Sequence, residues 1–267
     1  MKNPNSLDSL CGALSYAMDI NAPEHAANPN SDLCNYVDDA LCGEKADRIF
    51  MYNPDAIAQW IYEKYSPMFS EVKDMTDIET PFCTVLPSVT PVCFGTMYTG
   101  AQPEVHGIRA YKKPVITIDT IFDALIRAGK KPAIVSTGND SMSKIYLERD
   151  MDYFICGSIE QANAKAAELI IEDKYDFIAV YNGNYDSAMH RFGPESNEAL
   201  GELRANVRTF GIFYELIAKH WKSHNTLVGF AMDHGCHEID GNCGSHGIDT
   251  EEDLNIVHLY KALKAEK

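Results

Sequence analysis

The 267-residue sequence lacks several features that would mark a membrane, secreted or nucleic-acid-binding protein. Residues 1–20 contain no basic stretch followed by an apolar run, so no signal peptide is predicted. No run of about 18 apolar residues occurs, so no membrane span or membrane partner is expected. Basic residues are scarce, at 23 against 39 acidic ones, which gives a formal net charge of −16. This charge argues against a nucleic acid polymer as partner, because phosphate contacts need clustered Lys and Arg.

Paired cysteines are also missing. The eight cysteines are scattered and none belongs to a CxxC motif. In a chain of this length without a predicted signal, they are expected to be reduced thiols, which predicts a cytoplasmic protein. The hydrophobic content of 45% and charged content of 23% are typical of a globular protein, and no internal repeat occurs. A single domain over residues 1–267 is expected, with residues 1–45 as an N-terminal helical and loop extension packed on it.

From residue 48 onward, strand-like and helix-like segments alternate. Short apolar runs predict buried strands at 48–52, 132–135, 176–181 and 227–232. Helical spacing or capping patterns predict helices at 7–18, 57–65, 121–129, 158–172 and 200–221, and a polar loop is expected at 21–45. The alternation predicts an α/β fold, a three-layer α/β/α sandwich with a mostly parallel central sheet. Ligands on such sheets bind beyond the carboxyl ends of the strands.

Aspartate and histidine recur directly after two of these strands. Asp186 and His190 follow the third predicted strand, and Asp233 and His234 follow the fourth. His246 comes slightly later, in a glycine-rich segment. Asp186 and His190 are four residues apart, so one helical turn would direct both towards one ion. Alone, such an Asp is more often a helix cap and such a His a satisfied polar residue. At one sheet edge the whole set favours a metal site, and its ligand types suit zinc or manganese.

A second segment of interest begins Leu86-Pro-Ser-Val-Thr90. It is rich in turn residues, then small and apolar, then rich in turn residues again. A hydroxyl at a helix start that faces anions is a natural phosphate contact. Thr90 could equally serve only as a helix cap, and the pattern alone leaves both interpretations open.

Taken together, these motifs resemble the type I phosphodiesterases and nucleotide pyrophosphatases of the alkaline phosphatase superfamily. The resemblance rests on Leu-Pro-Ser-Val-Thr90, Thr96-Met-Tyr-Thr-Gly100, Pro103-Glu104 and His106-Gly-Ile108, followed in order by the Asp-x-x-x-His, Asp-His-Gly and His-Gly elements. It extends from about residue 47 to 260. Each motif is weak alone, whereas four in sequence are specific. The resemblance implies an alkaline phosphatase-like fold and a metal-dependent hydrolase of phosphoric esters.

The resemblance also implies roles for individual residues. Thr90 would attack phosphorus and form a phosphothreonine intermediate, assisted by two divalent metal ions, zinc or alternatively manganese. One ion would be held by the aspartate and two histidines at 186, 190 and 246, and the other by the residues at 233, 234 and 90. With a carboxylate from the first strand, the implied ligands are Asp55, Asp186, His190, Asp233, His234 and His246.

Two positions depart from the family pattern. The family has an Asp followed by Gly at the end of the first strand, where Asp55 is favoured by its charge and Asn53 by its nearness to the strand. An Asn that steadies the phosphoryl oxygen is often found three residues after the Thr, but Cys93 stands here. His237, close after Asp233 and His234, is a candidate phosphate contact, but a solvated loop histidine is the more expected interpretation.

The substrate is expected to be a small phosphate ester. A Thr nucleophile favours a diester or pyrophosphate, by resemblance. A monoester carries more charge and needs another cation, but the lysines nearest to Thr90 in the sequence are Lys73, Lys112 and Lys113. Alternatives are a phosphomonoesterase, a phosphonate hydrolase, a phosphate transferase, a hydrolase without a covalent step, and a metal-binding relative without catalysis. The stretch between the two Asp-His motifs is mostly helix, so an open site without a specificity domain is expected.

Overall fold

The computed structural model describes residues 1–266 and contains one large sheet and one hairpin. The large sheet has the strand order β2-β9-β6-β1-β5-β3-β4, and β7 pairs with β8. Only β9 runs antiparallel to its neighbours. The strands are β1 (Arg48–Pro54), β2 (Ile78–Cys83), β3 (Pro132–Thr137), β4 (Asp152–Cys156), β5 (Phe177–Asn182), β6 (Thr226–Phe230), β7 (His237–Ile239), β8 (Cys243–Ser245) and β9 (Asn255–Leu263).

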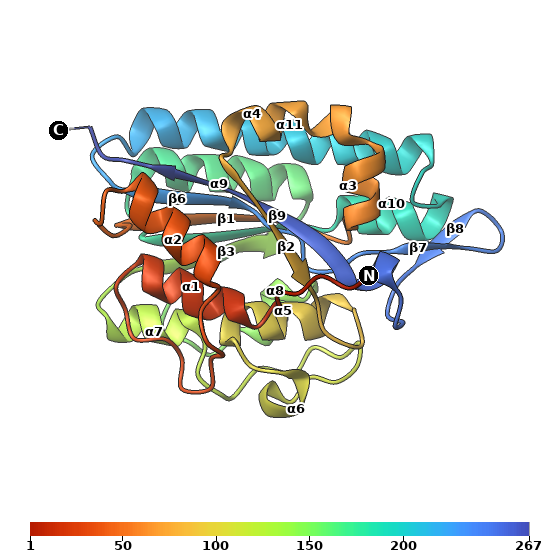
Figure 1. The fold of residues 1–267 in the computed structure, drawn as a ribbon, viewed down its shortest axis with the longest axis horizontal. Coiled ribbons are helices and arrows are strands. Elements are labelled where there is room, and N and C mark those ends of the chain that lie inside the picture. The colour runs from red at the N-terminus through yellow and green to blue at the C-terminus, as the bar shows by residue number, and fades with distance from the viewer. Residues whose placement is uncertain (267) are drawn as a thin grey trace.

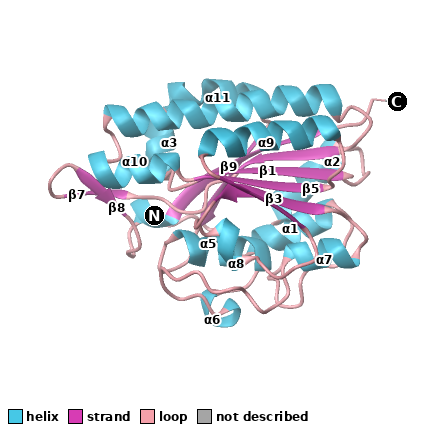
Figure 2. Ribbon diagram, turned by 180° about the vertical axis from the view of Figure 1, so that it is seen from behind, coloured by secondary structure: helices cyan, strands magenta, loops and turns pink. Residues whose placement is uncertain are grey.

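Helices cover both faces of this sheet (Figure 1). The helices are α1 (Ser9–Ala17), α2 (Ser31–Ala40), α3 (Gln59–Lys64), the 3-10 helix η1 (Ser66–Phe69), α4 (Ser70–Met75), α5 (Thr90–Thr99), α6 (Pro103–His106), α7 (Ile121–Arg127), α8 (Met142–Ile145), α9 (Ile159–Glu172), α10 (Asn184–Phe192), α11 (Asn197–His220) and α12 (Glu251–Leu254). In Figure 2, α9, α10 and α11 lie on one side of the strands, and α5, α7 and α8 lie on the other. This confirms the predicted three-layer α/β fold with a mostly parallel sheet. Among the residues described, no helix is long and apolar enough to span a bilayer.

The centre of the sheet determines where the carboxyl ends of the strands meet. β1 pairs in parallel with β5 on one side and β6 on the other, with Tyr52 in register with Val180 and Phe230. Every residue of these three strands is buried, because helices cover both faces. The segments that follow β1, β5 and β6 therefore emerge at one edge, next to each other.

The expectation of a loop throughout residues 21–45 is wrong, because α2 occupies part of this segment. The side chain of Asn30 caps the helix by accepting a hydrogen bond from the backbone N–H of Leu33 at 2.9 Å. Leu33, Val37 and Leu41 are spaced four residues apart and are fully buried. The high polar content of the segment concealed this narrow apolar stripe. Together α1 and α2 pack on the α5 side of the sheet and on β2 and β9.

One buried histidine in the antiparallel strand leads to a prediction about acid stability. The Nε2 atom of His258 lies 2.6 Å from the carbonyl oxygen of Met232, and burial lowers the pKa of this ring to about 4. The unfolded chain takes up the proton near pH 6.5, whereas the folded protein does so only near pH 4. The contribution of this group to the free energy of unfolding is therefore complete above pH 6.5, and about 3 kcal/mol of it is lost between pH 6.5 and 4.

Urea unfolding at pH 7, 5.5 and 4 measures this loss. The free energy of unfolding should decline less with falling pH in His258→Gln than in the wild type. His25→Gln, at an exposed position, is the control and should follow the wild type. Equal declines in all three proteins would contradict the prediction.

Candidate active site

Thr90 is the first residue of α5 and lies at the shared edge of the strands. Its Oγ1 atom is 3.4 Å from Oδ2 of Asp55, which directly follows β1, and 3.4 Å from Nε2 of His234, which comes after β6. Only 3% of the Thr90 surface is exposed. The N-terminus of a helix carries a partial positive charge, so an anion beside this hydroxyl is favoured.

Asp55, Asp233 and His234 form one cluster, in which one ligand atom from each lies within 4.8 Å of the others. Nε2 of His234 is 3.3 Å from Oδ1 of Asp55 and 3.4 Å from Oδ2 of Asp233. These two carboxylate oxygens are buried and accept no hydrogen bond. Burying an unsatisfied carboxylate oxygen is costly, and a divalent cation at this position would remove that cost.

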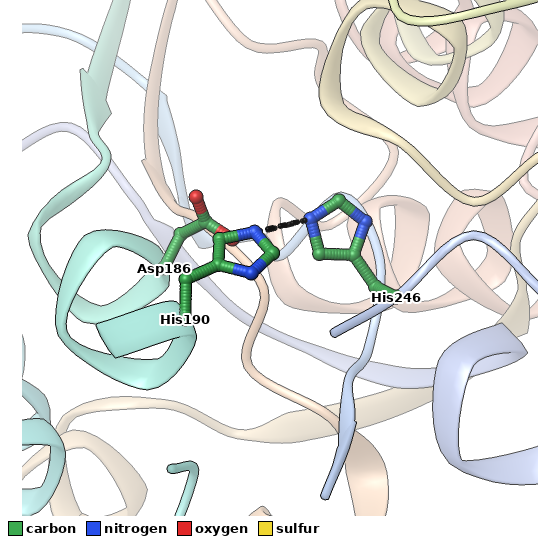
Figure 3. Close-up of side chains that lie close together, drawn as sticks. All are labelled: Asp186, His190 and His246. Carbon is green, nitrogen blue, oxygen red and sulfur yellow. Dashed lines mark hydrogen bonds and ion pairs between the residues drawn. The ribbon is translucent and has the colours of Figure 1, made fainter. Parts of the chain in front are cut away.

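Asp186, His190 and His246 form a second cluster of the same kind (Figure 3). The first two project from α10, and His246 follows β8, so the small hairpin delivers the third side chain. The two Nε2 atoms are 3.0 Å apart, and Oδ1 of Asp186 is 3.3 Å from each of them. This oxygen is also buried without a hydrogen-bond donor.

All three histidines have the ring orientation of a metal ligand. In each ring Nδ1 contacts a backbone carbonyl oxygen, which can only accept, so Nδ1 carries the hydrogen of the neutral ring. The Nε2 lone pair is then free to bind a metal, as in the usual outer shell of a ligating histidine. The contacts are His190 to Gly244 at 3.0 Å, His234 to Gly235 at 2.9 Å and His246 to Ser88 at 2.8 Å.

The two clusters differ in their protonation when no cation is bound. Burial, with Asp186 nearby, raises the pKa of Asp55 to about 7, and burial also raises the pKa of Asp233 well above its usual value. Burial lowers the pKa of His234 to about 3. In the second cluster burial opposes ionisation of Asp186, but the two histidines beside it outweigh this effect and lower the pKa of the carboxyl. The neighbouring carboxylate of Asp186 raises the pKa of His190 to about 9. Divalent cations would replace these protons, so their binding is expected to release them.

The structure distinguishes Asn53 from Asp55, the two candidate metal ligands at the end of the first strand. The amide of Asn53 donates to the carbonyl oxygens of Met51 and Val180 at 3.1 and 3.0 Å, and its oxygen accepts from the hydroxyl of Tyr98 at 2.9 Å. The side-chain amide of Asn53 therefore forms its hydrogen bonds with the strands and with Tyr98 of α5. Asp55 lies in the cluster with Asp233 instead.

Two further candidate residues, Cys93 and His237, lie outside the wall of the pocket that contains Thr90. Cys93 is fully buried within the hydrophobic core, and burial raises the pKa of its thiol well above the usual value. His237 places Nδ1 2.6 Å from Oδ1 of Asp253 and forms a separate pair at the start of β7. Neither residue lines the pocket that contains Thr90.

A pocket of about 280 Å³ opens beside both clusters and contains Thr90, Asp55 and Asp186 in its wall. Lys113 also lines it, from the loop between α6 and α7. Lys113, one of the lysines nearest to Thr90 in the sequence, therefore shares a pocket with it. No local pattern could have placed Lys113 here, because a loop without regular structure brings it back to the sheet edge.

Comparison with known proteins defines the family. A model of "Type I phosphodiesterase / nucleotide pyrophosphatase" matches residues 118–265, more than half of the chain. The chain belongs to the type I phosphodiesterase / nucleotide pyrophosphatase family. The matched region contains the second cluster together with Asp233 and His234, whereas Asp55 and Thr90 precede it. Family membership supports a phosphoester hydrolase, and both clusters are suited to the metal dependence that is general in this family.

Individual relatives are distant. Human ectonucleotide pyrophosphatase/phosphodiesterase family member 7 is 34% identical over 73 residues, which are 27% of this chain and 16% of the human protein. Murine ectonucleotide pyrophosphatase / phosphodiesterase 5, in an inactive form in complex with AMP, superposes with a TM-score of 0.58 at 17% identity, over 73% of this chain and 59% of the murine one. The human counterpart gives a TM-score of 0.59 at 17% identity, over 72% and 58%. These structures share the fold, and this chain covers less than two thirds of each relative.

The hydroxyl of Tyr181 donates a hydrogen bond to Oδ2 of Asp55 and thereby orients the carboxylate. Such outer contacts typically contribute 10- to 100-fold to metal affinity. Tyr181→Phe is therefore expected to weaken the binding of one of two zinc ions by about tenfold in a competition titration with a chelator. Tyr98→Phe removes a buried hydroxyl that contacts Asn53 rather than a cluster, and it should leave zinc affinity unchanged. A similar loss in both variants would show that general loosening of the site, and not the Tyr181 contact, determines affinity.

Proposed function

We propose that this protein cleaves phosphodiesters or pyrophosphates by transferring a phosphoryl group to the hydroxyl of Thr90. The observation that supports this best is the position of that hydroxyl at the start of α5, beside a cluster with two unsatisfied buried carboxylate oxygens and a free histidine lone pair. A residue that served only as a helix cap would not need such surroundings. The N-cap residue of α5 is Val89 rather than Thr90.

The two clusters have the ligand types and unsatisfied atoms that two divalent metal ions require, so the residues fit the implied cofactors. Asp55, Asp233, His234 and the hydroxyl of Thr90 would hold one ion, and Asp186, His190 and His246 the other. The mixture of imidazole and carboxylate favours zinc, with manganese as the alternative. When bound, such ions lower the pKa of a hydroxyl and neutralise charge that develops on phosphoryl oxygens.

The chain itself supplies the nucleophile and its orientation. Oδ2 of Asp55 lies 3.4 Å from the Thr90 hydroxyl and would receive its proton. The Thr90 oxygen then forms a bond to phosphorus while the bond from phosphorus to the leaving oxygen breaks. The positive end of α5 stabilises the negative charge of the phosphothreonine. Water then hydrolyses this ester, releases phosphate or a phosphate monoester and restores the hydroxyl.

The experiment that tests the function is turnover by metal-stripped protein with zinc or manganese added back. We expect metal-dependent hydrolysis of bis-p-nitrophenyl phosphate at a higher kcat/KM than p-nitrophenyl phosphate. Stoichiometric metal uptake without turnover of either ester would instead indicate a metal-binding relative without catalysis. Preferred hydrolysis of p-nitrophenyl phenylphosphonate would indicate a phosphonate hydrolase.

Phosphomonoester hydrolysis is the second candidate, and a specific observation favours it. A monoester carries one more negative charge than a diester, and Lys113 in the pocket wall offers a cation for it. Higher kcat/KM on p-nitrophenyl phosphate than on the diester would establish this alternative.

A further inference from the structure

We propose that Lys113 binds a second anionic group of the substrate, next to the phosphoryl group that reacts. This inference rests on the function proposed above and defines the substrate class more closely. The preferred esters would carry a further phosphate or carboxylate on one of their substituents.

The first observation is that the positive charge of Lys113 is isolated. It is the only lysine or arginine among the described residues that line the pocket with Thr90. Its Nζ atom donates a hydrogen bond to the carbonyl oxygen of Asn139 at 2.7 Å and lies 5.1 Å from the ring centroid of Tyr111. Within residues 1–266 this ammonium forms no ion pair. An ammonium has three N–H donors, so two are left for a ligand.

The acidic residue Asp140, in the same pocket wall, does not neutralise Lys113. Asp140 also lines the pocket, but its oxygens accept hydrogen bonds of 2.7 to 3.1 Å from neighbouring residues. The donors are Ser136, Thr137 and Ser143, so this carboxylate holds the loop after β3 to the start of α8. The carbonyl oxygen of Asn139, which Lys113 contacts, belongs to the same anchored loop. The lysine is therefore positioned by a fixed acceptor rather than by an opposite charge.

The carboxylates of the metal clusters leave the charge of Lys113 unpaired. The ammonium makes no ion pair with Asp55 or Asp186, although both carboxylates line the same pocket. A phosphoryl group at Thr90 would contact the clusters, whereas Lys113 would meet the part of the ester that extends along the pocket. The wall of the same pocket also includes polar residues such as Thr137, Asn139 and Ser141. A charged or polar substituent suits such a wall better than an apolar one.

The net charge of the protein is opposite in sign to the charge of Lys113. With a formal net charge of −16, the protein as a whole repels an anionic ligand. An unpaired cation in the pocket that contains Thr90 would therefore select where such a ligand enters and how it is oriented.

The test compares two non-hydrolysable phosphonates of similar shape. Butylphosphonate ends in a methyl group, and 3-phosphonopropionate ends in a carboxylate. Isothermal titration of zinc-loaded wild-type protein is expected to show about tenfold tighter binding of 3-phosphonopropionate, the effect of one charge-assisted hydrogen bond. Lys113→Met should abolish this preference and leave butylphosphonate affinity within about threefold, and Lys113→Arg should restore most of it. Lys112→Met removes the same charge from the neighbouring exposed residue, which does not line the pocket, and should retain the full preference.

Each other outcome has a distinct meaning. A preference that persists in Lys113→Met, or is absent from the wild type, overturns the role of Lys113 and leaves the proposed function intact. An equal loss of both phosphonates in Lys113→Met places the lysine on the phosphoryl group itself, which also overturns the inference. Failure of both phosphonates to bind zinc-loaded wild-type protein contradicts the proposed function, and the inference fails with it.

Discussion

Thr90→Ala is expected to lower kcat on bis-p-nitrophenyl phosphate by at least about 1000-fold, while both zinc ions are retained at their sites. The hydroxyl lies at the positive end of α5, and its oxygen lies 3.4 Å from a carboxylate that would accept its proton. Without it, phosphoryl transfer to the protein cannot occur, and water would have to attack directly. The six other proposed ligands remain, so metal content should fall little. Stopped-time assays together with metal analysis of the dialysed protein check both parts.

The matched variant for this experiment is Thr90→Ser, which keeps the hydroxyl and removes only a methyl group. It should retain activity within about 100-fold and be labelled at residue 90 when a slowly hydrolysed substrate is trapped by acid quenching. Full activity of Thr90→Ala would exclude the covalent mechanism. It would favour a hydrolase in which water attacks phosphorus without a protein-bound intermediate.

Asp233→Asn is expected to change stability in opposite directions with and without metal. Burial raises the pKa of this carboxyl, and Asp55 beside it adds to the effect, so without a cation the ionised form is unfavourable. A raised pKa means that stability is lost as pH rises, so the penalty is greatest in alkaline solution. In EDTA at pH 8 the variant should therefore be more stable than the wild type, by about 1 to 3 kcal/mol.

With zinc the order should reverse. A ligand that binds only the folded protein at 1000 times its dissociation constant stabilises it by about 4 kcal/mol, and Asp233→Asn would lose most of this at one site. Denaturant unfolding in EDTA and in excess zinc measures both differences. Asp140→Asn is the control, because that carboxylate is surrounded by donors and its loss should destabilise the protein in both solutions. If Asp233→Asn were also less stable in EDTA, Asp233 would be a structural acceptor rather than an unsatisfied ligand.

The alternation of segments was sufficient to predict the layers of the fold. A strand covered on both faces must be apolar throughout, as at 48–52 and 227–232, and a helix that covers it must carry an apolar stripe. Both signals are local, so they can be recognised without knowing the contacts. β2, β4, β9 and the β7–β8 hairpin were not predicted. β2 and β9 lie at and next to the sheet edge, and their pairing joins residues about 180 positions apart, such as Ile78 and Tyr260.

Some features of the site were likewise evident from local sequence, and others depend on the tertiary structure. Aspartate and histidine after consecutive parallel strands indicated a cluster, because the carboxyl ends of such strands meet at one edge. The sequence therefore determined the family, the layers and the residue types at the edge. Only the tertiary structure distinguished Asp55 from Asn53 and brought Lys113 to the pocket. Whether Asn53 or Asp55 faces the cluster depends on the hydrogen bonds that the neighbouring strand and helix offer to Asn53. The position of the loop that carries Lys113 depends on the surface against which the loop packs. Both are long-range contacts, and no local pattern encodes them.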